Sequence, residues 1–209
     1  MIIDINNIKI VILAGGLGTR LRPSIGYSIP KPMALINGKP FLEYQLRYIA
    51  KHGFKNVILC VSYLKEQIID YIGDGSNFGI KIEHRVEKEL LGTGGAIKNI
   101  DKMIGDFFFV INGDTYPLFD ITESIGFYYE KNDSDCLGII MGALHEKSED
   151  KGTVQLDKNG KVVAFNEKGK SNRKDCLVNT GVYFFNSDIF SQNVWQKRCS
   201  LEKDVFPAL

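Results

Sequence analysis

The sequence has almost no net charge, because its 26 Lys and Arg residues are balanced by 25 Asp and Glu residues, leaving a formal charge of +1. A protein with so little net charge lacks the long-range field that steers proteins onto a phosphate polymer or an anionic membrane. We therefore expect neither nucleic acid nor a membrane surface as its main partner. Any anion that it binds must be held by local groups.

Long apolar runs and targeting signals are also absent. The run from Ile8 to Ala14 is interrupted by Lys9, and the run that ends at Ile111 has only five apolar residues, whereas a membrane-spanning helix needs about 20. The first residues lack the basic start, apolar stretch and small-residue cleavage site of a secretory signal. These absences predict a cytoplasmic protein with no membrane span.

Paired cysteine motifs are missing as well. The four cysteines contain no C-x-x-C pair and lie far apart in the sequence, so neither a zinc site nor a disulfide framework is indicated. We expect reduced, mostly buried thiols. The residues concerned are Cys60, Cys136, Cys176 and Cys199.

The patterning of apolar residues favours an α/β fold. Strand-like segments occur at 8–14, 56–61, 80–86, 107–111, 135–143 and 177–186, and helical patterns at 40–52, 64–72 and 93–104. Strands that alternate with helices and read as nearly continuous Val, Ile and Phe indicate a mostly parallel sheet with helices on both faces. A chain of 209 residues fits one domain of this kind, which buries roughly 70% of its unfolded surface.

The second half of the chain has a different pattern. Segments 153–156 and 162–165 flank Asn159-Gly160, a turn signal typical of a β-hairpin. No repeat or Pro/Gly/Ser linker separates the halves. We therefore expect a single domain over 1–209, with a nucleotide-binding half at about 8–115 and an elaborated second half at 116–209.

A glycine-rich segment, Leu13 to Pro23, follows the first strand directly. Glycines leave backbone N–H groups bare and close to a ligand, which suits phosphate oxygens, and such loops bind ligands at the carboxyl ends of strands in open α/β sheets. A Walker loop is excluded because no Gly-Lys-Ser/Thr follows, and a dinucleotide fingerprint fails because Leu21 stands where its third glycine would be. The loop residues expected to touch a nucleotide are Leu13, Ala14, Gly15, Gly16, Gly18 and Thr19.

Two cations accompany this loop. Arg20 lies inside it, and Lys31 follows between two prolines. Arginine offers a planar fork for phosphate oxygens and lysine a compact point charge, while the flanking prolines restrict the backbone at Lys31. A glycine nest with two fixed cations suits a polyphosphate that becomes more negative during reaction, although either cation alone would also fit a solvated surface turn.

Together, the G-G-x-G-T-R-L-x-P pattern at Gly15 to Pro23 and the P-K-P pattern at Pro30 to Pro32 resemble those of the sugar-1-phosphate nucleotidyltransferases. The resemblance extends to the S-x-E-x-D-x-x-P stretch at Ser200 to Pro207. It implies a Rossmann-like three-layer α/β/α fold with a mixed central sheet. It also implies the Mg²⁺-assisted reaction of a nucleoside triphosphate with a sugar 1-phosphate to give an NDP-sugar and pyrophosphate, with Arg20 and Lys31 as catalytic cations.

The expected strand at 107–111 ends in Asn112-Gly113-Asp114. A carboxylate at a strand end can ligate Mg²⁺, which commonly takes one or two carboxylates plus substrate phosphates, but the same residue could simply form an Asx-turn. The family carries its metal-binding aspartate in this G-D pair. The resemblance therefore assigns Asp114 a catalytic role as a Mg²⁺ ligand and places Asn112 by the sugar phosphate.

A second motif, Glu87 to Ala96, has the pattern E-x-x-x-x-G-T-G-G-A. By resemblance this segment recognises the base through a side chain near its start and the backbone at Gly92, with Thr93 next to it. Guanine presents two adjacent donors, and an ionised carboxylate only accepts hydrogen bonds. Glu87 therefore favours GTP, although an exposed glutamate at a strand end remains the alternative.

The resemblance places the sugar phosphate in the second half of the chain. Glutamate accepts hydrogen bonds from sugar hydroxyls, and a lysine can neutralise the phosphate, so this transfer depends on positioning and charge more than on proton movement. An ordinary surface ion pair is the alternative for the adjacent charged pair. The residues assigned are Gly152, Glu167, Lys168, Asn179 and Thr180.

The pattern resembles the short guanylyltransferases for D-glycero-α-D-manno-heptose 1-phosphate most closely. We therefore expect GTP and this heptose phosphate as substrates, for surface polysaccharide biosynthesis. The alternatives are a mannose-1-phosphate guanylyltransferase, a uridylyl-, thymidylyl- or cytidylyltransferase, and a non-catalytic subunit that senses a nucleotide sugar. Members of the family often form homo-oligomers, but no stretch of this sequence identifies an interface.

One family motif is not found. Members continue to a D-x-G-T-P-like strand whose aspartate is the second metal ligand, and this sequence contains no D-x-G-T. Set against the resemblance, this indicates a truncated form, a metal site completed in another way, or an inactive protein. We favour a truncated form, which would bind nucleotide but turn over poorly.

Overall fold

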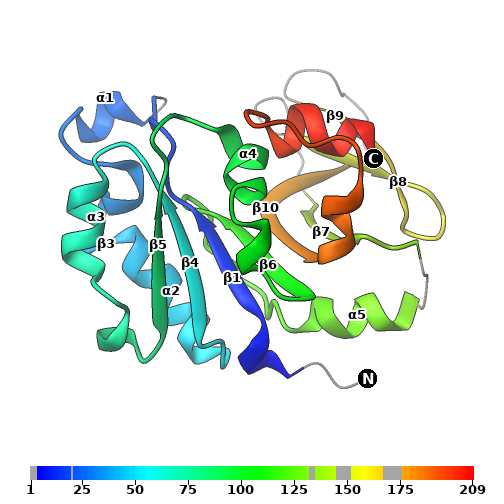
Figure 1. Ribbon diagram of the computed structural model, residues 1–209, viewed down its shortest axis with the longest axis horizontal. Helices are drawn as coiled ribbons and strands as arrows, with labels where there is room; N and C mark the ends of the chain where they lie inside the picture. Colours follow the sequence, from blue (N-terminus) through cyan, green and yellow to red (C-terminus); the bar gives the residue numbers. More distant parts are fainter. Residues whose placement is uncertain (1–3, 20, 132–134, 145–151, 167–175) are drawn as a thin grey trace.

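The computed structural model describes residues 4–19, 21–131, 135–144, 152–166 and 176–209 (Figure 1). Its centre is an eight-stranded mixed sheet with the order β5-β4-β1-β6-β10-β8-β9, and β7 also pairs with β10. The first four strands of this order are parallel, and the pairs that involve β10 and the β8–β9 pair are antiparallel. The strands are β1 (Lys9–Leu13), β4 (Asn56–Val61), β5 (Lys81–Val86), β6 (Phe107–Asn112), β7 (Gly138–Ala143), β8 (Thr153–Leu156), β9 (Val162–Asn166) and β10 (Cys176–Asn186).

Helices cover both faces of this sheet. The α-helices are α1 (Arg22–Ile25), α2 (Phe41–Lys51), α3 (Lys65–Ile72), α4 (Gly92–Lys98) and α5 (Glu123–Lys131). Short helical turns are η1 (Ile5–Asn7), η2 (Lys31–Met33), η3 (Ser76–Phe78), η4 (Asp101–Met103), η5 (Ser187–Ser191), η6 (Leu201–Val205) and η7 (Phe206–Ala208). A separate two-stranded sheet pairs β2 (Leu35–Ile36) with β3 (Lys39–Pro40).

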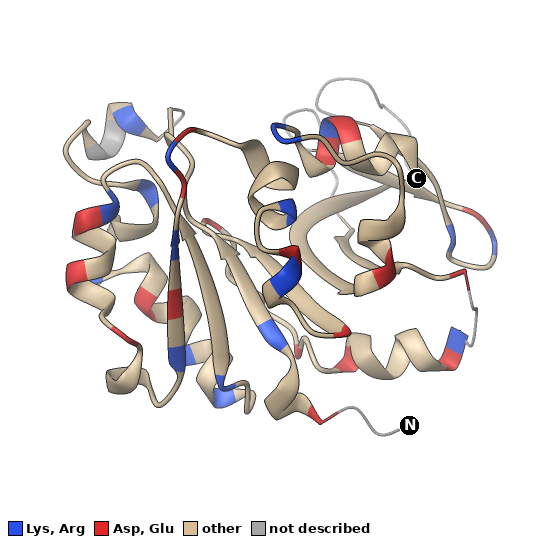
Figure 2. Ribbon diagram, viewed as in Figure 1, with Lys and Arg blue, Asp and Glu red and all other residues tan. Residues whose placement is uncertain are grey.

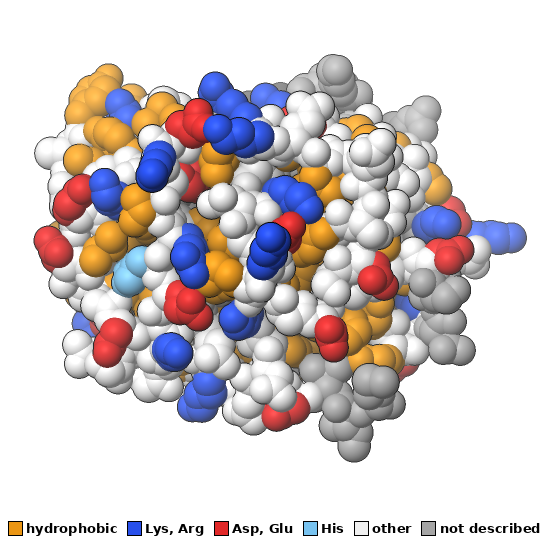
Figure 3. Space-filling view, viewed as in Figure 1, with side chains coloured by type: hydrophobic (Ala, Val, Ile, Leu, Met, Phe, Trp, Pro, Cys, Tyr) orange, Lys and Arg blue, Asp and Glu red, His pale blue; other side chains and the backbone are white. Residues whose placement is uncertain are grey.

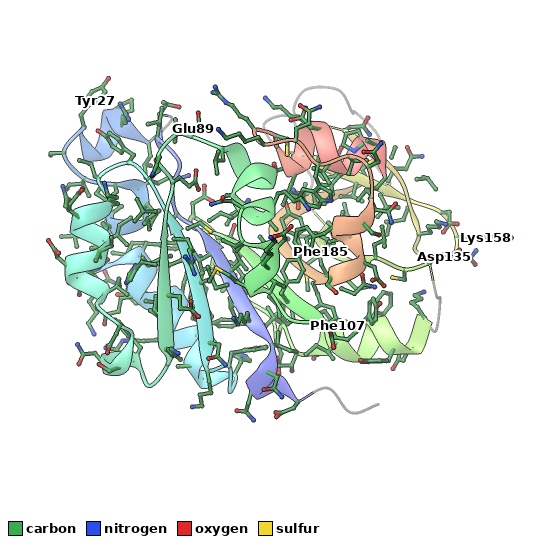
Figure 4. All side chains as sticks on the ribbon, in the orientation of Figure 1. Tyr27, Glu89, Phe107, Asp135, Lys158 and Phe185 are labelled. Atoms are coloured by element: carbon green, nitrogen blue, oxygen red, sulfur yellow. The ribbon has the colours of Figure 1, made fainter. Side chains whose placement is uncertain are left out.

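The alternation of side chains along the strands creates two cores. On β1, Ile10 and Ile12 are fully buried among residues of α2 and α3, with part of α5 packed against them, whereas Val11 is buried on the opposite face with residues of α4, η6 and η7. Phe107 and Phe185, labelled in Figure 4, belong to these two different cores. The three-layer α/β/α fold with a mixed central sheet is thus confirmed.

Most elements occur where the sequence predicts them, including the hairpin of β8 and β9. Two predictions need correction. The helix expected over 93–104 ends at Lys98, because the backbone tightens at Asn99 and Ile100 and continues as the separate turn η4. The strand expected over 135–143 begins at Gly138, since the carbonyl of Cys136 accepts hydrogen bonds from two side chains instead of from a strand.

Charge is mixed over the surface. Figure 2 shows Lys and Arg interleaved with Asp and Glu along the ribbon, and the face in Figure 3 carries both signs among apolar side chains. Within the described ranges, no helix is long and apolar enough to cross a membrane. None of the four cysteines, all of which lie within the described residues, forms a disulfide; Cys136 is partly exposed and the other three are buried, as expected.

Candidate active site

A cleft of about 730 Å³ lies at the carboxyl ends of the parallel strands and is lined by residues of both halves of the chain. These strand ends form the upper edge of the sheet in Figure 1. The loop after β1 contributes every residue from Ala14 to Thr19 to the lining. The cleft therefore lies where open α/β sheets bind ligands.

The glycine loop fits closely against its neighbours. Gly18 has φ +63°, and a Cβ on it would lie 2.9 Å from the Cβ of Lys31. A Cβ on Gly113, at the end of β6, would lie 2.7 Å from the carbonyl oxygen of Leu13, which already accepts a hydrogen bond from the Gly113 N–H. Glycine at these two positions is what allows the loop, Lys31 and the end of β6 to meet.

Lys31 and Asp114 face each other across the cleft. The Lys31 ammonium donates a hydrogen bond to Asp114 Oδ2, and the side chains are 27% and 42% exposed. Because both groups remain accessible to solvent, each can exchange its partner for a ligand. The pair thus offers a cation for phosphate and a carboxylate for a metal ion at one place.

Asn112 anchors the floor of the cleft. Its carbonyl accepts a hydrogen bond of 2.9 Å from Gln45 Nε2, while its own side-chain oxygen is buried with no partner in the part of the chain that the structure describes. The strand β10 approaches so closely that a Cβ on Gly181 would lie 2.5 Å from Asn112 Nδ2. Thr115 closes the arrangement by donating from Oγ1 to the carbonyl of Thr180 at 2.9 Å. These contacts join the two halves directly beneath the cleft.

Glu87 lies at the end of β5, on the wall opposite the second half. Its Oε2 accepts a hydrogen bond of 3.2 Å from the Leu91 N–H, and its Oε1 would be 3.2 Å from a Cβ on Gly15. Burial raises the pKa of this carboxyl above its usual value. Since one oxygen is held by the backbone, the other is the more available acceptor for a base.

The segment after Trp195 covers the start of α4. The carbonyl of Cys199 accepts from the N–H groups of Gly94 and Gly95 at 3.0 and 3.1 Å. A Cβ on Gly92, which has φ +77°, would lie 2.5 Å from the same carbonyl oxygen. The glycines of the G-T-G-G-A motif therefore allow the backbone of the C-terminal segment to pack against the start of α4. The same motif also lines the cleft.

Residues predicted to contact the sugar phosphate form the far wall. The Asn179 N–H donates to the carbonyl of Gly152 at 2.9 Å, and Thr180 Oγ1 donates to the carbonyl of Met141 at 2.7 Å. Gly152, Asn179 and Thr180 all line the cleft.

The structure thus gathers fifteen of the predicted site residues into one cleft. They are Leu13, Ala14, Gly15, Gly16, Gly18, Thr19, Lys31, Glu87, Gly92, Thr93, Asn112, Asp114, Gly152, Asn179 and Thr180. Arg20, Glu167 and Lys168 lie outside the described residues. Among the charged residues of the cleft lining, two were missed, Arg198 and Glu202. Glu202 lies in the S-x-E-x-D-x-x-P stretch, which marked a family resemblance but assigned no role to its carboxylate.

The donor set suits a metal ion only together with a substrate. Across the described ranges, no group of three or more His, Cys, Asp and Glu side chains gathers as a preformed metal site. Asp114 nevertheless offers an accessible carboxylate two residues after Asn112, whose buried side-chain oxygen has no partner among the described residues. This fits Mg²⁺, which takes few protein ligands and completes its shell with phosphates and water.

A glycine loop after the first strand, with a lysine and an aspartate facing each other at the strand ends, is typical of α/β enzymes that bind nucleotides. The family comparison agrees, because a model described as "Nucleotidyl transferase" matches residues 9–207. The chain belongs to the nucleotidyl transferase family.

Individual relatives cover most of the chain. It is 45% identical over 194 residues to a D-glycero-α-D-manno-heptose 1-phosphate guanylyltransferase from Campylobacter jejuni, covering 92% of this chain and 82% of the relative. It is 36% identical over 205 residues to a mannose-1-phosphate guanylyltransferase from Mycobacterium tuberculosis, covering 98% of this chain but only 56% of that protein. The crystal structure of HddC from Yersinia pseudotuberculosis complexed with GMP-PN is similar with a TM-score of 0.80 and 36% identity, covering 97% and 86% of the two chains.

Proposed function

We propose that this protein transfers the guanylyl group of GTP to D-glycero-α-D-manno-heptose 1-phosphate, giving a GDP-sugar and pyrophosphate for surface polysaccharide biosynthesis. The proposal is supported by the heptose 1-phosphate guanylyltransferase that is 45% identical and by the likeness to HddC complexed with GMP-PN. The observation that carries it is that one cleft is lined both by the Glu87 carboxylate and by the Lys31–Asp114 pair.

In this reaction an oxygen of the sugar phosphate attacks the α-phosphorus of GTP. A new P–O bond forms as the bond to the β-phosphate oxygen breaks, and pyrophosphate leaves with the electron pair. The nucleophile is already ionised, so no general base is needed, and the protein's task is to hold the groups in line and neutralise charge. Lys31 is placed to do this at the glycine loop, and we expect Arg20 and Lys168 to add charge at the nucleotide and sugar phosphates.

Asp114, with Asn112 beside it, would hold Mg²⁺. When bound, the ion withdraws charge from the phosphate oxygens and fixes them in position. The protein groups prepare this by keeping the carboxylate open to the cleft and the floor rigid through Gln45.

Guanine selection rests on the acceptor character of Glu87. Glu87 and Gly92 both line the cleft, and the hydrogen bond from the Leu91 N–H to Glu87 Oε2 holds them near each other; there the two donors of guanine would find an acceptor-only group. Uracil and thymine present carbonyl acceptors that the carboxylate repels. A mannose-1-phosphate guanylyltransferase is the second candidate, supported by the relative from Mycobacterium tuberculosis.

We further propose that residues 8–115 bind the nucleotide and that residues 116–209 bind the sugar within a single domain. That the four cysteines, all within the described residues, form no disulfide supports action in the cytoplasm.

The test is direct product analysis. The purified chain is incubated with GTP, Mg²⁺ and either heptose 1-phosphate or mannose 1-phosphate, and the products are identified by mass spectrometry. GDP-heptose as the dominant product is expected. GDP-mannose formed faster would favour the second candidate, and binding of a nucleotide sugar without any product would instead indicate a sensing role.

A further inference from the structure

A chain of hydrogen bonds runs through the cleft wall from the nucleotide side to the sugar side. Thr93 Oγ1, at the start of α4, donates to Glu202 Oε2 at 2.7 Å. Tyr183 OH donates to Glu202 Oε1 at 3.5 Å, and Asn179 Nδ2 donates to the Tyr183 hydroxyl at 2.8 Å. Three of these side chains, those of Thr93, Glu202 and Asn179, also line the cleft.

Glu202 is the central residue of this series of hydrogen bonds, and its two carboxylate oxygens have different partners. Oε2 accepts from both Thr93 and Ser200 Oγ, the latter at 2.8 Å, whereas among the described residues Oε1 has only the long contact with Tyr183. A carboxylate oxygen accepts more than one hydrogen bond. One side of the carboxylate is therefore fixed to α4, and the other can tighten toward β10.

The Tyr183 side chain is held in place by its packing, so it can relay a shift of Glu202 to Asn179. Its side chain is 0% exposed, and its ring stacks with Phe185 and meets Phe206 edge-on. Burial raises the pKa of its phenol, so the hydroxyl remains protonated and keeps its donor. With the ring fixed, movement of Glu202 changes the Tyr183 hydrogen bond and, through it, the amide of Asn179.

The other end is equally constrained. Thr93 Oγ1 accepts from the Leu201 N–H at 2.8 Å while it donates to Glu202. The Cys199 carbonyl is held by the backbone of α4. The segment that carries Glu202 therefore follows any shift of α4, where the nucleotide base is proposed to bind.

We propose that Glu202 is a positioning residue that couples nucleotide binding to sugar phosphate binding through Thr93 on one side and Tyr183 and Asn179 on the other. This inference rests on the proposed function, since it assigns the two ends to the two substrates. Partly buried side-chain networks of this kind respond as units, so loss of any one link affects both ends. Coupling between two sites typically changes affinity by about 5- to 150-fold.

The experiment measures the dissociation constant of D-glycero-α-D-manno-heptose 1-phosphate by calorimetry, without and with saturating GTP, in a buffer that contains EDTA to prevent turnover. For the wild type we expect at least about 5-fold tighter sugar phosphate binding in the presence of GTP. Glu202→Gln and Tyr183→Phe should bring this ratio close to one while the affinity for GTP alone changes by less than about twofold.

Threonine variants provide an independent test that does not disturb the core. Thr93→Val should abolish the coupling ratio, and Thr93→Ser, which keeps the hydroxyl, should restore it. Asp204→Asn is the matched control, because Asp204 is exposed on the same helix η6 and contacts the Ser200 N–H instead of the cleft; its ratio should equal that of the wild type.

The results that would contradict the coupling can be told apart from those that would contradict the proposed function. A wild-type ratio of one, or a ratio preserved in Thr93→Val and Glu202→Gln, overturns the coupling while leaving the proposed function intact. Failure of the wild type to bind GTP or the sugar phosphate overturns the proposed function and this inference with it. Equal losses of both individual affinities in Thr93→Val and Thr93→Ser would indicate a merely structural role.

Discussion

Lys31 and Asp114 form an ion pair across the cleft although 83 residues separate them in the chain. Pairs between partly exposed charges contribute about 0–1 kcal/mol to stability. The pair is therefore better explained by a role in the site than by a role in folding. Lys31 can leave Asp114 to bind a phosphate, and Asp114 can then bind a metal ion.

Replacing Lys31 with methionine should lower kcat for pyrophosphate formation by about 10²- to 10³-fold, the usual effect of removing one group that stabilises transition-state charge. Folding should be nearly unchanged, because little stability depends on the pair. Steady-state kinetics and thermal unfolding of Lys31→Met measure the two effects. Lys55→Met, at a surface position outside the cleft lining, is the control; equal activity of both variants would contradict the role of Lys31.

Substituting Gly18 with alanine should destabilise the protein by about 1 kcal/mol or more, since it places a Cβ at positive φ and 2.9 Å from the Lys31 Cβ. Gly16→Ala is the matched control, because its φ is not positive and its Cβ would meet nothing within 4 Å. Urea unfolding of the two variants gives the comparison. Indistinguishable midpoints would mean that the loop does not depend on this conformation.

The lowered pKa of Glu43 should make the free energy of unfolding depend on pH. Its side chain is buried on α2, and hydrogen bonds from Tyr71 and Arg47, with a further one from Lys39, lower the pKa from 4.5 to about 2. A depressed pKa adds stability above the unfolded value of 4.5 that is lost as the pH falls toward 2. The shift corresponds to about 3 kcal/mol at most.

Urea unfolding at pH 7, 4.5 and 3 should therefore show a steep loss of stability in the wild type that Glu43→Gln lacks. Glu130→Gln, an exposed glutamate on α5, should retain the wild-type profile. An unchanged pH profile in Glu43→Gln would show that other carboxylates cause the acid sensitivity.

Local patterns were enough to predict the parallel strands, the hairpin and the position of the glycine loop. The helix α5 was missed because its sequence, with Gly126 followed by Phe127, Tyr128 and Tyr129, has weak helix propensity; packing of its aromatic face onto the sheet supplies the stability instead. The resemblance assigned separate roles to Lys31 and Asp114, but their pairing was not predicted, since spacing alone cannot bring separate loops together.

The role of Glu202 could not be predicted from the sequence. Its role depends on hydrogen bonds to Thr93 and Tyr183, which are distant in the chain, and no local pattern of residues encodes such contacts. Only the three-dimensional arrangement makes it a candidate.

Changing Glu87 to glutamine should reduce selectivity for GTP. The amide offers one acceptor and one donor group instead of acceptors alone, so one guanine donor loses its partner, at a cost of about 1–3 kcal/mol or roughly 5- to 150-fold in kcat/KM for GTP. Because burial raises the pKa of Glu87, GTP use by the wild type should fall as the pH drops toward that pKa, and Glu87→Gln should lack this dependence.

The control is Glu89→Gln. Glu89, labelled in Figure 4, lies on the same connection, but it forms an exposed ion pair with Lys197. Its selectivity and pH profile should match those of the wild type. If Glu87→Gln retained full preference for GTP, the base would have to be recognised elsewhere.

The central claim is that this cleft performs guanylyl transfer to a sugar 1-phosphate. The most direct measurement is the rate of pyrophosphate release by the wild type with heptose 1-phosphate and each of GTP, UTP, dTTP and CTP under identical conditions. The account predicts a kcat/KM for GTP at least about 10-fold above that for every other nucleotide, the difference that one discriminating hydrogen bond supplies. Equal or faster release from UTP, dTTP or CTP, or no release from any of them, would contradict it.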